Sequence, residues 1–374
     1  AVVNDESALV LSGFAAFLDP PKESAASALS ELQKIGVTIK VVTGDSDLVT
    51  RHVCQQLNIE VQGVLTGKEI ALLDDQTLQR RVETANLFCR VNPGQKQRVI
   101  LALKANQHVV GYMGDGINDA PSLHAADVGL SVDSAVDVAK AAADIILLKQ
   151  DLNVLHAGVL EGRRTFGNIM KYIMMGTSSN FGNMFSMAGA ALFLPFLPML
   201  PTQILLNNIL YDISEIPIPL DDVDAQETAQ PRVLDLRFIR NFMLLIGPIS
   251  SLFDFLTFYV LIEVLKAEEK LFQTGWFVES LCTQVLVIFV IRTRGNPFKS
   301  KPHPLLALTS IAIVVTAIVL PLTPLGMYFG FVAPPARFYG ILAIMVMAYL
   351  CIVQMGKQLF YRYAINHASR GSVR

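Results

Sequence analysis

The segment Tyr112–Leu123 (YMGDGINDAPSL) limits the possible folds of this chain more than any other stretch. An apolar run leads into Gly-Asp-Gly, and Asn-Asp-Ala-Pro follows almost at once. Glycines permit a tight turn at the end of a strand, and open α/β folds place their ligands at that edge of the sheet. We therefore expect Asp115, Asn118 and Asp119 to converge on one spot whose oxygen atoms suit Mg²⁺. A plain Gly-Asp turn with a helix cap is the alternative, and the Asn-Asp-Ala-Pro run behind the turn argues against it.

Short apolar runs alternate with helical patterns through the first 160 residues, which predicts a parallel sheet with helices on both faces. The stretch 59–75 is expected to be irregular, with short helices. The expected strands are 9–17, 37–42, 86–91, 108–113, 128–132 and 145–148, and the expected helices are 23–34, 47–57, one opening at 92–96, and 135–142.

Two further positions are expected at the same sheet edge as Asp115. The strand 37–42 delivers Thr43-Gly44-Asp45 there. Lys96 falls in the first turns of a helix, where the dipole does not favour a cation. Neutralising a phosphoryl group would explain a lysine at this position, and a solvated surface lysine is the alternative.

The two parts of the chain differ in composition. Overall, 52% of the 374 residues are hydrophobic and 17% are charged, but from Phe166 onward several apolar runs reach the ~20 residues that cross a bilayer. We predict an α/β domain over 1–160 and a six-helix transmembrane domain over 161–374. The six expected spans are about 166–193, 202–219, 239–263, 276–292, 305–322 and 337–356. Basic residues in the loop 292–303 and in the tail place both, with residues 1–160, in the cytoplasm.

Polar residues inside the spans are costly and mark functional positions. The first span carries Asn180 and Asn183 on one face, and the second carries Asn208 and Asp212 on one face. Two prolines after Glu215 break the second helix and free backbone carbonyls, as in the ion sites of transporters. We expect Asn207 to serve helix packing, Glu215 to be offset from Asp212, and Asp254 and Gln284 to be explained by contacts between helices.

The remaining composition excludes several classes of protein. The four cysteines are scattered without a CxxC pair, which argues against a disulfide framework or a thiolate metal site. No basic stripe suggests nucleic acid as a partner. The chain does not begin with Met, and we expect it to be the carboxyl-terminal part of a longer protein.

The segment YMGDGINDAP resembles the hinge motif of P-type ATPases, a branch of the haloacid dehalogenase fold, with Met113 where the family usually has Thr. The resemblance covers about residues 9–230 with specific motifs. It implies that ATP is the substrate, that Thr43 binds phosphoryl oxygens with Asp45 beside it, and that Lys96 contacts the phosphate. It also implies that Asp115 and Asp119 serve a catalytic Mg²⁺.

The nucleophile of that family, the Asp of Asp-Lys-Thr-Gly, does not occur in this sequence. The Thr-Gly-Glu loop that releases phosphate is missing too. We therefore expect this chain to need the preceding half of the same pump as its partner, and neither to phosphorylate itself nor to transport ions alone.

The membrane half resembles the same family. SSNFGN (178–183) and QILLNNILYD (203–212) align with ion-binding segments of the calcium-pump branch, with Asn183 where that branch has Glu. The run NNILYDISEIPIPLDDVD resembles the bacterial magnesium-transporting branch most closely. The resemblance implies a multi-pass pump of the bacterial inner membrane that imports Mg²⁺, a divalent cation suited to a sparse, amide-rich site. The alternatives are a proton or calcium pump, a membrane-anchored phosphatase, and a truncated regulatory product.

Overall fold

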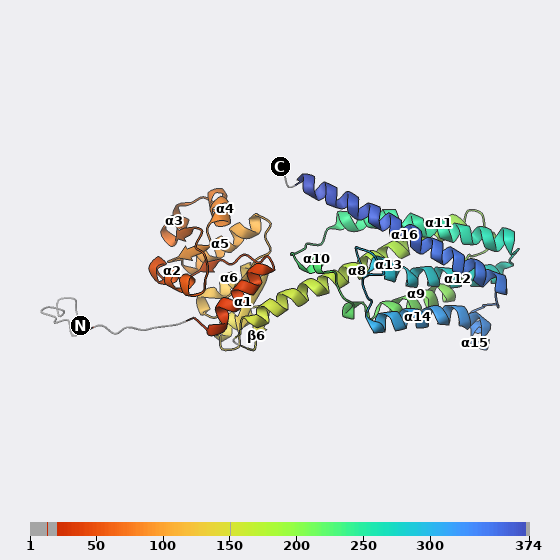
Figure 1. The fold of residues 1–374 in the computed structure, drawn as a ribbon, viewed down its shortest axis with the longest axis horizontal. Coiled ribbons are helices and arrows are strands. Elements are labelled where there is room, and N and C mark those ends of the chain that lie inside the picture. The colour runs from red at the N-terminus through yellow and green to blue at the C-terminus, as the bar shows by residue number, and fades with distance from the viewer. Residues whose placement is uncertain (1–12, 14–20, 150, 372–374) are drawn as a thin grey trace. The chain divides into compact units, whose positions relative to one another are not determined.

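The structure is a computed structural model that describes residues 13, 21–149 and 151–371. It divides into two compact units, Ala1–Val159 and Leu160–Arg374 (Figure 1).

The first unit has two parallel sheets of three strands each, in the orders β1-β3-β2 and β4-β5-β6. The strands are β1 (Val41–Val42), β2 (Val64–Thr66), β3 (Leu87–Cys89), β4 (Gly111–Met113), β5 (Val128–Val132) and β6 (Ile145–Leu147). The helices are α1 (Glu23–Lys34), α2 (Asp47–Gln56), α3 (Gly67–Leu72), α4 (Asp75–Thr84), α5 (Pro93–Ala105), α6 (Ala120–Ala125) and α7 (Asp137–Ala142), and a 3₁₀ turn covers Ile117–Asp119.

The parallel pairing confirms the predicted class of sheet, but the prediction of one continuous sheet is wrong for the described residues. No ladder joins β1 to β4 among them, so each sheet keeps a free edge on that side. The expected strand 9–17 lies outside the described residues. Within 59–75 the prediction of irregular structure missed β2, whose three residues pair with β3. Three residues are too few to show a period in the sequence.

Local sequence explains where the helices of this unit begin. The side chain of Asn92 accepts from the backbone N–H of Gln95 at 2.9 Å, and the Gln95 side chain accepts from the N–H of Asn92 at 3.0 Å. This reciprocal cap, with Pro93 at the first helical position, starts α5 directly after β3. The side chain of Ser46 caps α2 after β1 by accepting from the backbone N–H of Val49, without a reciprocal bond. Each cap therefore fixes the direction of the chain at a carboxyl end of a strand.

The second unit is helical. Its elements are α8 (Asn153–Ala190), α9 (Pro201–Glu215), α10 (Ala225–Thr228), α11 (Leu236–Tyr259), α12 (Glu269–Leu286), α13 (Ile288–Ile291), α14 (Pro304–Val319), α15 (Pro324–Tyr328) and α16 (Ala336–Gly371), where α8 starts within the first unit. Short 3₁₀ or π turns extend α9, α11 and α14, at Ile218–Leu220, Val260–Val264 and Leu320–Leu322 respectively.

Four segments among the described residues are long and apolar enough to span a membrane: Leu236–Val264, Glu269–Ile291, Pro304–Leu322 and Ala336–Arg362. They coincide with the last four predicted spans. Helices also occupy the first two predicted spans, as α8 and α9, but these do not meet the same criteria. Helix α9 ends at Glu215 because Pro217 and Pro219 cannot continue it. Length and composition therefore support four of the six predicted spans.

Helix α12 runs through the middle of the bundle, where it contacts α9, α11, α14 and α16 (Figure 1). Its core side chains include Trp276, which lies edge-on to Phe258 of α11 with ring centroids 5.0 Å apart. Such edge-to-face pairs add stability beyond the burial of their area. The bundle is thus built around α12.

Candidate functional site

The loop after β4 is folded tightly over the side chain of Asp119. A Cβ atom added at Gly114 would lie 2.5 Å from the Cβ of Asp119, so only glycine allows this approach. The N–H of Gly116 donates to Asp119 Oδ2 at 3.3 Å. The two glycines expected from the sequence to form a turn therefore also hold a buried carboxylate.

Two side chains share the other oxygen of Asp119. Lys96 Nζ from α5 and the Tyr112 hydroxyl from β4 each donate to Oδ1 at 2.8 Å. Burial alone would raise the pKa of Asp119, but these hydrogen bonds outweigh it and hold the pKa below its ordinary value. Burial and the neighbouring carboxylate raise the pKa of Tyr112. Lys96, whose side chain is 14% exposed, is thus a paired lysine and not a solvated surface one.

Asp115 and Asn118 are exposed on the same loop. The backbone carbonyl of Asp115 accepts from Val136 N at 3.2 Å, and its side chain borders a cavity of about 620 Å³ beside β4 and β5. Asp119 has both oxygens occupied, whereas the side chain of Asp115 is exposed. The donor set therefore fits Mg²⁺ held by one carboxylate with phosphate oxygens and water, and Asp119 would hold Lys96 in place beside it.

Thr43 and Asp45 form a closed turn after β1. The Thr43 hydroxyl donates to Asp45 Oδ2 at 2.8 Å, and the N–H of Asp45 donates to Thr43 Oγ1 at 3.1 Å. Among the described residues, no hydrogen bond or ion pair joins this turn to the group around Asp119. The structure thus brings together Lys96, Asp115, Asn118 and Asp119, while Thr43 and Asp45 stay on the other sheet.

The four residues predicted to bind the transported ion do not form one buried cluster. Asn183 is half-buried, and the Ser280 hydroxyl of α12 donates to its Oδ1 at 3.3 Å. Asn180, Asn208 and Asp212 are exposed, because they lie on faces of α8 and α9 that the described helices leave uncovered. Asn207 is buried at 3% exposure, in line with the packing role expected for it.

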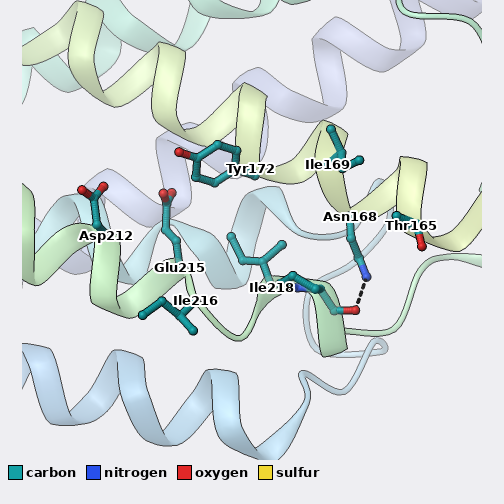
Figure 2. Close-up of a pocket in the computed structure, with 9 residues that line it drawn as sticks. Thr165, Asn168, Ile169, Tyr172, Asp212, Glu215, Ile216 and Ile218 are labelled. Carbon is teal, nitrogen blue, oxygen red and sulfur yellow. Dashed lines mark hydrogen bonds between the residues drawn. The ribbon is translucent and has the colours of Figure 1, made fainter.

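Asp212 borders a second cavity, of about 400 Å³, between α8 and the end of α9. Figure 2 shows its carboxylate and that of Glu215 on the same side of α9, facing the α8 helix that carries Tyr172. Glu215 was expected to be offset from Asp212, but three residues along a helix return to nearly the same face. The i, i+3 spacing was the signal that could have identified it.

A buried ion-pair network around Asp221 was not predicted. Arg292 donates to both of its carboxylate oxygens, and Lys171 Nζ lies 2.7 Å from Oδ2. Burial would raise the pKa of Asp221, but Arg292 and Lys171 hold it below its ordinary value. The three residues come from sequence positions too far apart for any motif to connect them.

Asp254 is 2% exposed and joins three helices. Its two oxygens accept from the Ser186 hydroxyl of α8 at 2.6 Å and from the indole N–H of Trp276 at 2.8 Å. The amide of Gln284 donates to the Ser280 hydroxyl of α12 itself. The expectation of helix-to-helix bonding is thus confirmed for Asp254, and Gln284 contacts Asn183 only through Ser280.

Comparison with known protein families agrees with this geometry. Residues 4–127 match a model described as haloacid dehalogenase-like hydrolase, and residues 196–359 match one described as cation transporting ATPase, C-terminus. A magnesium-transporting ATPase, P-type 1, of Escherichia coli strain K12 is 46% identical over 364 residues, which cover 96% of this chain. Over 96% of its length the chain is therefore similar to a P-type ATPase.

Other relatives have similar descriptions. A magnesium-transporting ATPase, P-type 1, of Salmonella typhimurium strain 14028s is also 46% identical over 96% of the chain. A probable cation-transporting ATPase F of Mycobacterium tuberculosis strain H37Rv is 38% identical over 54% of the chain and 23% of its own length. The chain spans 40% of the length of the two magnesium-transporting relatives.

Proposed function

We propose that this chain is the hinge and membrane part of a P-type pump that couples ATP hydrolysis, through an aspartyl-phosphate, to the import of Mg²⁺. The observation that carries the proposal is the contact between Lys96 and Asp119 at 2.8 Å beneath the open Asp115. This pair, next to the exposed carboxylate of Asp115, supports a role for the end of β4 in phosphoryl transfer, which needs a cation at the phosphoryl group. The nucleophilic Asp would come from the part of the pump outside this sequence.

In this proposal the residues of the first unit bind and position the phosphoryl group. Lys96 neutralises its charge, and Asp119 with Tyr112 holds the ammonium in place. Asp115 would hold the catalytic Mg²⁺, which when bound supplies further charge for the phosphoryl oxygens. Thr43 would bind phosphoryl oxygens from the carboxyl end of β1 in the other sheet, with Asp45 and Asn118 orienting the two loops.

The membrane unit would carry the ion across the bacterial inner membrane through six spans, with residues 1–160 and the C-terminus in the cytoplasm. Asp212 would bind the ion together with Asn180, Asn183 and Asn208. One carboxylate among amides suits Mg²⁺, which usually takes one or two carboxylates and keeps several waters. Two relatives are described as magnesium-transporting ATPases, which supports the same ion.

A proton pump of the same family is the second candidate, because Asp212 alone could titrate. A membrane-anchored phosphatase is disfavoured by the buried polar contacts of α8 and α12, which an anchor would not need.

The test uses the full-length pump. Asp212→Asn should abolish Mg²⁺-stimulated ATP hydrolysis and the rescue of growth in a strain that lacks magnesium transport. Retained rescue by Asp212→Asn would count against the proposed ion site. Proton movement by the wild type without Mg²⁺ movement would favour the second candidate.

A further inference from the structure

The cavity between α8 and the end of α9 has a mostly apolar wall that carries several oxygen-bearing side chains. Thr165, Asn168 and Tyr172 of α8 face Asp212 and Glu215 of α9 across it. Isoleucine and proline side chains complete the lining (Figure 2). The cavity therefore offers carboxylate, amide and hydroxyl oxygens within an otherwise apolar wall.

Two of these oxygens are buried without a hydrogen-bond partner among the described residues. They are Oε1 of Glu215 and Oδ1 of Asn168, whose side chains are 4% and 2% exposed. The amide nitrogen of Asn168 donates to the carbonyls of Pro219 at 3.0 Å and Asp221 at 2.9 Å. Because both of these partners are acceptors, the amide orientation is determined and Oδ1 remains free. Buried acceptors are seldom left unpaired, so Asn168 Oδ1 needs a ligand. The Glu215 carboxylate also interacts with the hydroxyl of Tyr211, which lies four residues earlier on α9.

The charge of the cavity is not balanced by the protein. Its lining includes the carboxylates of Asp212 and Glu215 and, within the described part of the chain, no Lys, Arg or His. The nearest basic residues of α8 are held elsewhere. Lys171 lies 2.7 Å from Asp221, and Arg164 lies 3.4 Å from Asp222. A buried carboxylate without a protein cation either takes up a proton or binds a positive ligand.

We propose that this cavity binds a partly hydrated divalent cation, Mg²⁺, through Glu215, Asp212 and the amide oxygen of Asn168. The inference rests on the proposed function, and adds to it Asn168 and Glu215, which lie outside the set Asn180, Asn183 and Asn208. About 400 Å³ is ample for an ion with six waters, which need roughly 180 Å³ at ~30 Å³ each. A proton would need one oxygen only and would leave Asn168 Oδ1 unpaired. The site is thus a second station for the ion, next to the proline break.

The test counts bound ions in the full-length pump, with Mn²⁺ as the spectroscopic probe for Mg²⁺. Glu215→Gln keeps the shape of the side chain and removes its charge. By electron paramagnetic resonance titration, this variant should bind one Mn²⁺ fewer per pump than the wild type, or bind it at least tenfold more weakly. The matched control is Glu263→Gln, an exposed carboxylate that is paired with Lys266 and does not line the cavity. It should bind Mn²⁺ like the wild type, and excess Mg²⁺ should displace the ion in question.

A second variant keeps the test decisive if Glu215→Gln does not fold. Thr165 is exposed and lines the cavity, so Thr165→Asp adds a third carboxylate without disturbing packing. It should tighten Mn²⁺ binding several-fold. Unchanged Mn²⁺ binding in Thr165→Asp, or in a folded Glu215→Gln, overturns the inference. So does a Glu215→Gln variant in which only the pH profile of ATP hydrolysis shifts, since that would show a proton site.

The proposed function is tested independently of this cation site: it is contradicted if the wild-type pump forms no phosphoenzyme from ATP. Loss of one Mn²⁺ in Glu215→Gln would then still support a cation site in this cavity. If the wild type forms phosphoenzyme but Glu215→Gln binds Mn²⁺ as the wild type does, the proposed function is retained and the second ion site is rejected.

Discussion

Arg292 binds both oxygens of Asp221, with Nε 2.9 Å from Oδ2 and Nη2 3.0 Å from Oδ1. The carboxylate is 0% exposed and also accepts from Lys171 and from the N–H of His303. A forked pair of this kind is among the strongest polar contacts in proteins. It joins α8, the turn after α9 and the loop after α13.

Removing one member of this network should destabilise the pump. Asp221→Asn leaves Arg292 and Lys171 buried without their counter-charge, and the loss of one partner from a buried pair costs about 3–5 kcal/mol. The full-length protein should show a clearly lower Tm and poorer yield, measured by thermal unfolding in detergent. Glu263→Gln, which removes a carboxylate from an exposed pair, should change Tm little. Equal Tm values for the two variants would show that the network does not stabilise the unit.

Asp119→Asn should impair phosphoenzyme formation by releasing Lys96. The amide keeps the shape but loses the charge that holds the ammonium, so the level of acid-stable phosphorylation from ATP should fall by at least tenfold. Tyr112→Phe removes only one of the two hydrogen bonds to Oδ1 and should have a smaller effect. An effect of Tyr112→Phe as large as that of Asp119→Asn would contradict the role given to Lys96.

Asp115→Asn tests the catalytic metal. The substitution removes the open carboxylate beside β4, so phosphorylation of the full-length pump should drop by orders of magnitude and require more Mg²⁺. Initial rates at a series of Mg²⁺ concentrations would measure both effects. Near-normal turnover would place the metal elsewhere.

Lys96→Ala should slow phosphoryl transfer while the fold is retained. The lysine side chain makes one ion pair, with Asp119, whose remaining partners are Tyr112 and Gly116. Rapid-quench kinetics would measure the rate of phosphoryl transfer, and circular dichroism would check that the variant is folded. A variant with normal phosphorylation would leave Lys96 as a purely structural residue.

The lowered pKa of Asp119 predicts an acid-dependent contribution to stability. Burial opposes ionisation, but Lys96 and Tyr112 favour the charged form and leave the folded pKa below the ordinary value. The contribution is therefore complete above the unfolded pKa of about 3.9 and is lost as the pH falls through the folded pKa. The difference in Tm between wild type and Asp119→Asn should be largest near neutral pH and shrink below about pH 4. A difference in Tm that grows as the pH falls would contradict a stabilising contribution from ionised Asp119.

The sequence predicted the features that depend on neighbouring residues. Helix 23–34 and strand 128–132 appear with the predicted bounds, because their patterns are long enough to show a period. The glycine turn around Asp119 was also correctly predicted. The contact of Lys96 with Asp119 spans 23 residues, and only the fold decides it.

Features that depend on distant pairing were missed. In the network around Asp221, Lys171 lies 50 positions before the aspartate in the sequence and Arg292 lies 71 positions after it. In the sequence these residues therefore look like separate surface charges. The break between the two sheets was missed because hydrophobic runs predict strands but not their neighbours. The exposure of Asn180 and Asn208 likewise depends on which helices cover them and not on spacing.

Helix α16 carries a lysine that ends another helix. Lys357 is fully buried, and its Nζ donates to the carbonyls of Val290 in α13 and of Thr293 and Gly295 in the loop that follows, at 2.7, 2.8 and 3.1 Å. A one-residue slide of α16 would move the backbone at this lysine by about 1.5 Å along the axis, which would strain the three hydrogen bonds. The last helix and the loop after α13 are therefore tied together by one ammonium group, so a shift of one of them either carries the other along or breaks these bonds.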